Sequence, residues 1–228
     1  RLPYALNFKL RQHNVSDGFM QGASRGQYYL RDSKCFVEEW GPYTEPIATT
    51  YYMLMDLGNI ALFEPDNAEV RKLIRSSADW LLQRQKADGS WAVAYSDADN
   101  SEAFKDLRDL RPTFYGLLIA NRILGDEKYL DGARKGADWL IEHAVKPQQW
   151  LGVCGDTRFA PDFATAQSAQ ALLELYDATA ESRYLDAAMA TARFYATSVY
   201  TNPTASKRPV SVKGKPLEQW QITTSGLS

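Results

Sequence analysis

Acidic side chains stand at the borders of several apolar segments in this chain. Glu45 directly precedes a proline, Asp97 and Asp99 lie two apart in a polar stretch, and Asp162 directly precedes an apolar run. Glycoside hydrolysis needs two carboxylates, one that protonates the leaving oxygen and one that activates water or attacks the sugar. We therefore predict that Asp162 and one of Asp97, Asp99 or Glu45 form the acid–base pair.

Each of these carboxylates also has a structural explanation. Asp162 and Glu45 precede expected helices, where an N-terminal side chain satisfies free backbone N–H groups. Asp97 and Asp99 would be ordinary solvated residues of a polar loop. Calcium binding by this loop is weakly supported, because the spaced ligands and closing Glu of an EF-hand are absent. The residues alone leave the catalytic and structural interpretations open.

Aromatic residues in loops suggest sugar binding, because the C–H faces of pyranose rings pack on aromatic faces. The chain has 6 Trp and 13 Tyr, and several of them fall between the apolar segments. The predicted substrate-binding residues are Trp40, Tyr43, Trp91, Tyr95, Trp150 and Trp220, with Arg111 binding a substrate carboxylate. Trp91 has an alternative role as a cap on the core, since it follows the turn-forming pair Asp88-Gly89.

Other chemistries fit the composition less well. A zinc site requires Cys and His ligands together, and the chain has only 2 His and 2 Cys. The same shortage of His disfavours a Ser-His-Asp arrangement, so we expect neither a metal nor a cofactor. A uronate lyase remains open, with Tyr95 as the base and Arg108 or Arg111 neutralising the sugar carboxylate.

Charge and hydropathy limit the classes of partner that we expect. The 26 basic and 28 acidic residues give a formal charge of -2, and no basic stripe suggests nucleic-acid binding. The longest apolar stretches, such as residues 114–120, are too short to span a membrane. We expect a carbohydrate partner and favour a periplasmic or secreted location over a cytoplasmic one, although no motif specifies the compartment.

An internal repeat predicts the elements that position these residues. Ala78-Asp79-Trp80-Leu81 recurs 59 residues later as Ala137-Asp138-Trp139-Leu140, and a degenerate copy follows 55 residues after that at 192–195. Tyr129-Leu130-Asp131 recurs as Tyr184-Leu185-Asp186. Such a period suits a pair of helices with one long connection. We predict helix pairs over about 45–63 with 68–85, 111–124 with 129–145, and 162–179 with 184–199, after an irregular segment over 1–44.

The two helices of each predicted pair differ in character. The first helices are apolar around most of their circumference, which is typical of helices covered on all sides, whereas the second helices have one polar face. This asymmetry predicts an inner ring of helices inside an outer ring. The connections between pairs, about 86–110, 146–161 and 200 onward, all run from outer to inner helices and should gather at one end. Long loops of this kind are usually functional.

Two motifs resemble those of the six-hairpin glycosidase-like (α/α) toroids. One is Gln85-Lys86-Ala87-Asp88-Gly89-Ser90-Trp91, and the other runs from Asp162 to Tyr176. The resemblance covers roughly 45–200 and implies an all-α toroid that acts as a glycoside hydrolase on an oligosaccharide or polysaccharide, with uronate-containing glycans as one option. Because such toroids use about six pairs, we predict that residues 1–228 form a single incomplete toroid domain of three to four hairpins, the fourth beginning near Leu217, within a longer chain.

Three other functions remain possible on these grounds. A polysaccharide lyase would use the same fold. Terpene cyclases share the toroid and the Q-x-x-x-G-x-W pattern, but residues 97–100 lack their full acidic motif. A non-catalytic carbohydrate-binding or helical scaffold protein would need neither carboxylate.

Overall fold

The computed structural model describes residues 1–26, 28–37, 43–150, 163–197, 199–200, 211–218 and 226–227. Its helices are α1 (Leu2–Gln12), α2 (Pro46–Phe63), α3 (Ala68–Arg84), α4 (Phe114–Leu124), α5 (Glu127–Leu140), the π-helix η1 (Ile141–Val145), α6 (Phe163–Thr179) and α7 (Ser182–Ala196). The strands are β1 (Tyr28–Leu30), β2 (Cys35–Val37), β3 (Tyr43–Thr44), β4 (Tyr95–Ser96), β5 (Val199–Tyr200), β6 (Ser211–Val212), β7 (Lys215–Pro216) and β8 (Gly226–Leu227). They form four antiparallel two-stranded ribbons, β1–β2, β3–β4, β5–β8 and β6–β7.

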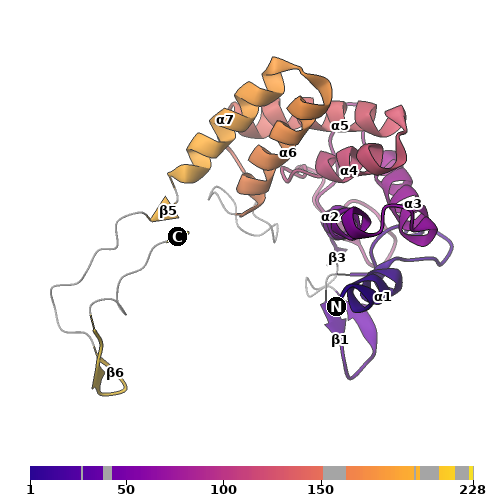
Figure 1. Cartoon of the computed structure of the whole chain (residues 1–228), viewed down its shortest axis with the longest axis horizontal. Coiled ribbons are helices and arrows are strands. Elements are labelled where there is room, and N and C mark those ends of the chain that lie inside the picture. Colours follow the sequence, from indigo (N-terminus) through magenta and orange to yellow (C-terminus); the bar gives the residue numbers. More distant parts are fainter. Residues whose placement is uncertain are drawn as a thin grey trace.

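Helices α2 to α7 form the three predicted pairs, α2/α3, α4/α5 and α6/α7. Successive pairs follow an arc, with α2, α4 and α6 on its inner side and α3, α5 and α7 on its outer side (Figure 1). The predicted all-α architecture, an incomplete (α/α) toroid of helical hairpins, is confirmed. The long connections after α3 and α5 lead from outer helices to the N-termini of inner ones, as the sequence indicated.

The core lies mainly between α2 and α4. Both helices bury most of their length, because apolar residues surround them on nearly every side. Gly116 allows a close approach, since a Cβ atom there would lie 3.0 Å from Leu54 Cδ1 and 3.2 Å from Leu81 Cδ1. Gly58 plays the same part on α2, where a Cβ would lie 2.8 Å from Ile119 Cγ2. Removal of this apolar surface from water is the main stabilising contribution to the arc.

The prediction of an irregular segment over residues 1–44 is wrong for residues 2–12, which form α1. Leu2, Leu6 and Leu10 are spaced four apart and pack one face of α1 against the core. Pro3 stands in the first turn, where a missing N–H costs nothing. Gly18, Gly22, Gly26 and Gly41, the glycines of this region, all follow α1 in the sequence.

The fourth helix pair predicted near Leu217 falls largely outside the described residues. Residues 211–216 form the β6–β7 ribbon, and residues 217–218 continue it without helical structure. Residues 226–227 form β8. The described part of this region therefore contains short strands where a helix start was expected.

The repeated sequence markers meet across the first joint between hairpins. Asp79 on α3 accepts a hydrogen bond of 2.8 Å from Tyr129 Oη. It also forms an ion pair of 2.8 Å with Lys128 Nζ. Arg75 on α3 lies 3.6 Å from the carboxylate of Asp126, which also caps the N-terminus of α5. The outer helix of one pair thus binds the turn of the next.

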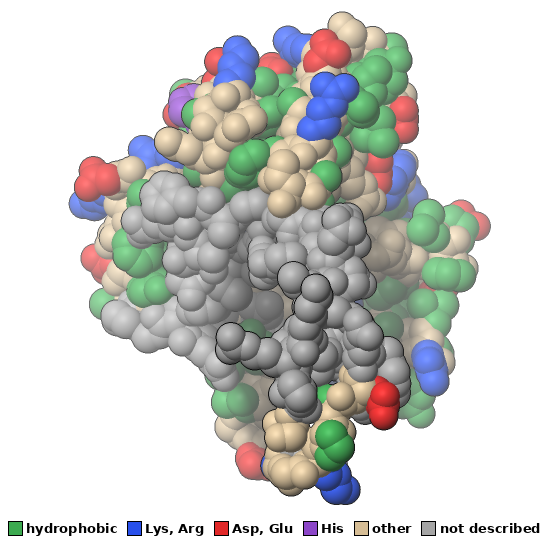
Figure 2. Space-filling view, turned by 90° about the vertical axis from the view of Figure 1, so that its left-hand side faces the viewer, with side chains coloured by type: hydrophobic (Ala, Val, Ile, Leu, Met, Phe, Trp, Pro, Cys, Tyr) green, Lys and Arg blue, Asp and Glu red, His purple; other side chains and the backbone are tan. Residues whose placement is uncertain are grey.

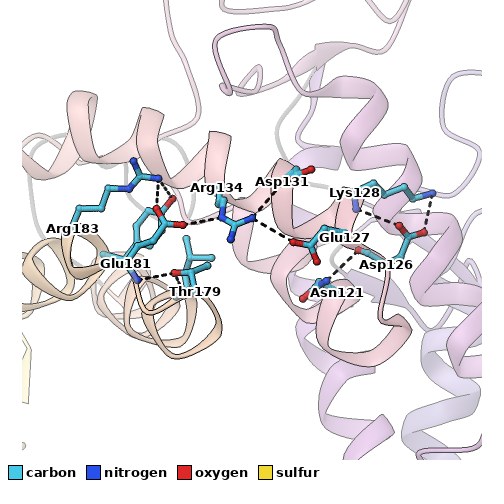
Figure 3. A network of polar contacts seen from close by, with 11 residues as sticks. Asn121, Asp126, Glu127, Lys128, Asp131, Arg134, Thr179, Glu181 and Arg183 are labelled. Atoms are coloured by element: carbon cyan, nitrogen blue, oxygen red, sulfur yellow. Dashed lines mark hydrogen bonds and ion pairs between the residues drawn. The ribbon is translucent and has the colours of Figure 1, made fainter.

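The second joint repeats this arrangement with equivalent residues (Figure 3). Arg134 Nε on α5 donates to Glu181 Oε1 at 3.0 Å. Arg183 Nη2 lies 3.3 Å from Asp138 Oδ2 and 2.7 Å from Glu181 Oε2. Asp138 and Tyr184 take the positions of Asp79 and Tyr129, so the Ala-Asp-Trp-Leu and Tyr-Leu-Asp repeats mark the residues that hold neighbouring hairpins together.

The turn after α3 depends on a glycine. Gly89 has a φ of +94°, and a Cβ atom there would lie only 2.3 Å from the backbone oxygen of Lys135. Gln85 ties the same turn to α5, because its Nε2 donates to the oxygens of Gly89 at 3.1 Å and Gly132 at 2.9 Å. Gln85 and the Asp-Gly-Ser-Trp turn therefore hold the end of α3 against α5.

We expect Gly89→Ala to lower the free energy of unfolding by about 3 kcal/mol. The alanine would adopt a strained positive φ, and the backbone of α5 would have to move away from its Cβ atom. Urea unfolding measures this change. Gly125→Ala is the matched control, since Gly125 has a φ of +70° but nothing lies within 4 Å of its added Cβ. That variant should lose only about 1 kcal/mol. Equal losses in the two variants would show that the close approach of α5 contributes nothing.

Candidate functional site

A buried ion network joins the loop ends of α2 and α4. Arg111 Nη1 donates to Glu45 Oε2 at 2.5 Å, and Arg111 Nε donates to Asp109 Oδ1 at 2.7 Å. Thr113 Oγ1 donates to the second oxygen of Asp109 at 2.9 Å. Glu45 is 4% exposed, and both Asp109 and Arg111 are 2% exposed. Glu45 precedes α2 and Thr113 precedes α4, so the network holds the starts of two inner helices together.

The two carboxylates of this network stabilise the positive charge of Arg111. Burial by itself would lower the pKa of Arg111, but the carboxylates of Asp109 and Glu45 outweigh burial and raise that pKa above its usual value. The guanidinium therefore stays protonated and is enclosed by protein carboxylates. In this position Arg111 and Glu45 serve as positioning groups, and Arg111 is not open to a substrate carboxylate.

A cavity of about 300 Å³ lies between α1, α2 and α6, on the inner side of the arc. We call it the inner cleft. Its walls include Lys9 and Gln12 of α1, Tyr52 and Asp56 of α2, and Phe163 and Gln167 of α6. This volume is at the lower end of the range of small-molecule sites.

The inner cleft combines aromatic rings with polar groups. The ring centroids of Tyr52 and Phe163 are 6.3 Å apart, and those of Tyr51 and Tyr52 are 4.2 Å apart. Lys9 forms an ion pair with Asp56, and Lys9 Nζ donates to Gln12 Oε1 at 2.8 Å. Aromatic surface beside hydrogen-bonding groups is the arrangement that a sugar ring requires, because its C–H faces are apolar and its hydroxyl groups are not.

The hydroxyl of Tyr51 contacts a side chain that lines the inner cleft. This hydroxyl donates to Gln167 Oε1 at 3.3 Å, and its pKa is raised well above the usual value, mainly by burial. The nearby charges of Arg111 and Asp109 also act on this hydroxyl, the first lowering and the second raising its pKa. Tyr51 therefore stays protonated and orients Gln167 at the wall of the inner cleft.

The predicted acid loop lies at the surface. Asp97 and Asp99 are both exposed in the turn that follows β4. Asp99 Oδ1 accepts hydrogen bonds from Ser101 N at 3.0 Å and Ser101 Oγ at 2.7 Å, and these bonds lower the pKa of Asp99. Asp97 and Asp99 are not among the residues that line the inner cleft. Asp162, Trp40 and Trp220 lie outside the described residues.

The remaining predicted aromatic residues lie in or against the core. Trp91 is 3% exposed, and its Nε1 donates to Leu81 O at 2.9 Å. Trp150 is also 3% exposed. Tyr95 is buried as well, and burial raises its pKa to about 12. Tyr43 packs edge-on against Phe104 with ring centroids 4.9 Å apart. Trp91 therefore caps the core, as the alternative interpretation of the sequence predicted, and it offers no open face to a sugar.

Sequence reasoning missed the residues that line the inner cleft. A signal was available, because Tyr52 lies within the first two turns of the helix that follows Glu45. Phe163 and Gln167 are likewise spaced four apart directly after Asp162. Residues one and two turns into an inner helix share the face that looks toward the centre of the arc.

Charged side chains of both signs are mixed on the visible face of the described part of the chain. Figure 2 shows one face of the molecule, on which basic and acidic side chains are interspersed with hydrophobic ones and neither charge forms a continuous field. Among the described helices none is both long and apolar enough to cross a membrane. Within the same residues, no group of three or more His, Cys, Asp and Glu side chains could hold a metal ion.

Comparison with known proteins identifies the fold. No protein-family model matches the sequence, and none of the curated proteins compared with it matches. Among solved structures, the chain is similar to an unsaturated glucuronyl hydrolase specific for heparin, with a TM-score of 0.56 and 16% sequence identity. The match covers 100% of this chain and 60% of that protein, so the chain spans less than two thirds of the length of its neighbour. Together with the arc of hairpins, this match shows that the chain has an (α/α) toroid fold.

Proposed function

We propose that this chain belongs to a carbohydrate-active enzyme of the glycoside hydrolase type that acts on uronate-containing oligosaccharides. The inner cleft carries this proposal, because it places aromatic rings and polar side chains together on the concave side of a toroid. The structural neighbour adds support, since it is a hydrolase of unsaturated glucuronyl substrates. A fold alone does not specify an activity. The chemistry of the cleft supports a sugar ligand, and the uronate part of the proposal rests on the neighbour's substrate.

We assign the role of general acid to Asp162. It directly precedes Phe163, whose side chain lines the inner cleft, and acid catalysis requires a carboxyl group beside the bound sugar. For the second role we propose Asp99, an exposed carboxylate outside the lining of the inner cleft, so the substrate must extend from the cleft to this loop. Asp97 is the alternative in the same loop. Glu45 is the least suited of the candidates, because its carboxylate is buried and paired with Arg111.

Incubation with disaccharides that carry a 4,5-unsaturated uronate tests the proposal. A hydrolase releases the unsaturated uronic acid, which rearranges to a keto acid and loses its ultraviolet absorbance. A lyase acting on a saturated uronate polymer would instead create absorbance. Turnover of neither substrate, with sugar binding retained, would identify a non-catalytic binding protein.

The lyase alternative is supported less well than the hydrolase. Its proposed base, Tyr95, is 6% exposed and has a pKa raised to about 12 by burial. A base must be accessible to the sugar and able to lose its proton near the working pH. Arg111, one of the two cations proposed to bind the uronate, is enclosed by Glu45 and Asp109.

Phe163→Ala is expected to raise KM for an oligosaccharide substrate about tenfold, because it removes an aromatic wall of the inner cleft. Steady-state kinetics on the disaccharide measures the change. Leu173→Ala is the matched control, since Leu173 lies on the same helix and is 44% exposed, against 43% for Phe163. An unchanged KM for Phe163→Ala would exclude this wall from the sugar site.

A further inference from the structure

A second groove lies between α1 and α3, and none of its lining residues lines the inner cleft. It has a volume of about 680 Å³ and is formed by the C-terminal end of α1, the loop that follows it and the first turns of α3. Among its lining residues are His13, Asn14, Gln21, Glu69, Lys72 and Ser76. We call it the His13 groove.

The loop that carries His13 is held firmly on α3. His13 N donates to Lys9 O at 3.0 Å, and the next residue pairs with Ala23 through a hydrogen bond of 2.8 Å. Ser77 Oγ donates to Gly22 O at 2.8 Å, and Trp80 Nε1 donates to Phe19 O at 2.6 Å. The position of the imidazole is therefore fixed by the fold.

His13 lacks polar partners within the described part of the chain. It is 6% exposed, and neither of its ring nitrogens has a hydrogen-bond partner there. A neutral imidazole offers one donor and one acceptor, and a buried polar group without a partner costs about 1–3 kcal/mol. A ligand in the groove that bonds to this ring would recover that cost.

Two cations act on the His13 ring: Lys72, which lines the groove together with Glu69, and Arg25, which is not among the lining residues. Burial lowers the pKa of His13, and the charges of Arg25 and Lys72 lower it further. Neither cation forms an ion pair within the described residues. Glu69 on α3 is the acidic residue that lines the groove, and Lys9 on α1 is already paired with Asp56. An anion placed beside His13 and Lys72 would accept a hydrogen bond from the ring and neutralise the unpaired cations.

We propose that the His13 groove binds an oxyanion, a sulfate or phosphate group, either free or carried by a larger ligand. His13 donates a hydrogen bond to the anion, and Lys72 and Arg25 supply the balancing charge. The bound anion stabilises the imidazolium form, so its affinity rises as the pH falls through and below the ordinary imidazole pKa of about 6.5. The site is independent of the inner cleft and of the proposed hydrolase activity.

Proton NMR of the full chain tests this site with a built-in control. The chain has two histidines, and His143 is stacked on Trp139 with ring centroids 4.3 Å apart in η1. Sodium sulfate, compared with sodium chloride at equal ionic strength, should raise the pKa of His13 and leave the ring-proton signals of His143 in place. The same titration with a sulfated disaccharide and its unsulfated counterpart distinguishes a free anion from a sulfated glycan.

A charge variant completes the experiment. Lys72→Met should weaken sulfate binding about tenfold, because it removes one charge-assisted contact. Lys146→Met is the matched control, since Lys146 is an exposed lysine of η1's C-terminal end paired with Glu142, and it should leave the affinity unchanged. Identical His13 titrations in sulfate and chloride, or equal sulfate affinities in the two variants, would overturn the proposal.

Discussion

Arg111→Met is expected to lower the free energy of unfolding by about 3–5 kcal/mol, the largest stability effect among the variants considered. The substitution leaves the carboxylates of Glu45 and Asp109 buried without the guanidinium that both contact. Urea denaturation followed by circular dichroism measures the loss. Arg122→Met is the control, because the Arg122 side chain is 50% exposed and its ion pair with Glu174 lies at the surface. That variant should lose less than about 1 kcal/mol.

A triple variant separates the two causes of this effect. Glu45→Gln, Asp109→Asn and Arg111→Met together remove every charge of the network while keeping similar side-chain volumes. If unpaired buried charge is responsible, the triple variant should be more stable than Arg111→Met alone. A triple variant less stable than the single one would show instead that the individual hydrogen bonds to Thr113 and the backbone dominate.

Asp162→Asn is expected to reduce kcat by about 10²- to 10⁴-fold with little change in KM, since the amide cannot donate the proton that the leaving oxygen requires. The disaccharide assay measures both parameters. Asp99→Asn should reduce kcat by a comparable factor if Asp99 is the second carboxylate. Wild-type rates in both variants would contradict the assignment of the acid–base pair, and circular dichroism checks that each variant is folded.

Most of the fold could be predicted because it depends on local sequence patterns. The apolar periodicity of α2 to α7 and the repeated Ala-Asp-Trp-Leu marker are properties of consecutive residues, and all three hairpins follow from them. Helix α1 was not predicted, although Leu2, Leu6 and Leu10 show the same periodicity, because it is a single short helix outside the internal repeat.

The candidate site was less predictable, since it depends on contacts between distant segments. Arg111 is two residues from Asp109, but its other partner, Glu45, lies 66 positions away. A single sequence does not show which acids pair with which cations. Trp91 was ambiguous for a related reason: a tryptophan after a turn serves the core or a ligand equally well until its neighbours are known.

The two joints between hairpins have a consequence for how such a chain can change in length. Arg75 and Asp79 present to the second hairpin the same groups that Arg134 and Asp138 present to the third. A protein from which one complete unit had been excised would set α3 against the turn that carries Glu181 and Arg183, with every opposite charge still matched. Duplication or loss of whole units could thus proceed without any new complementary surface having to evolve.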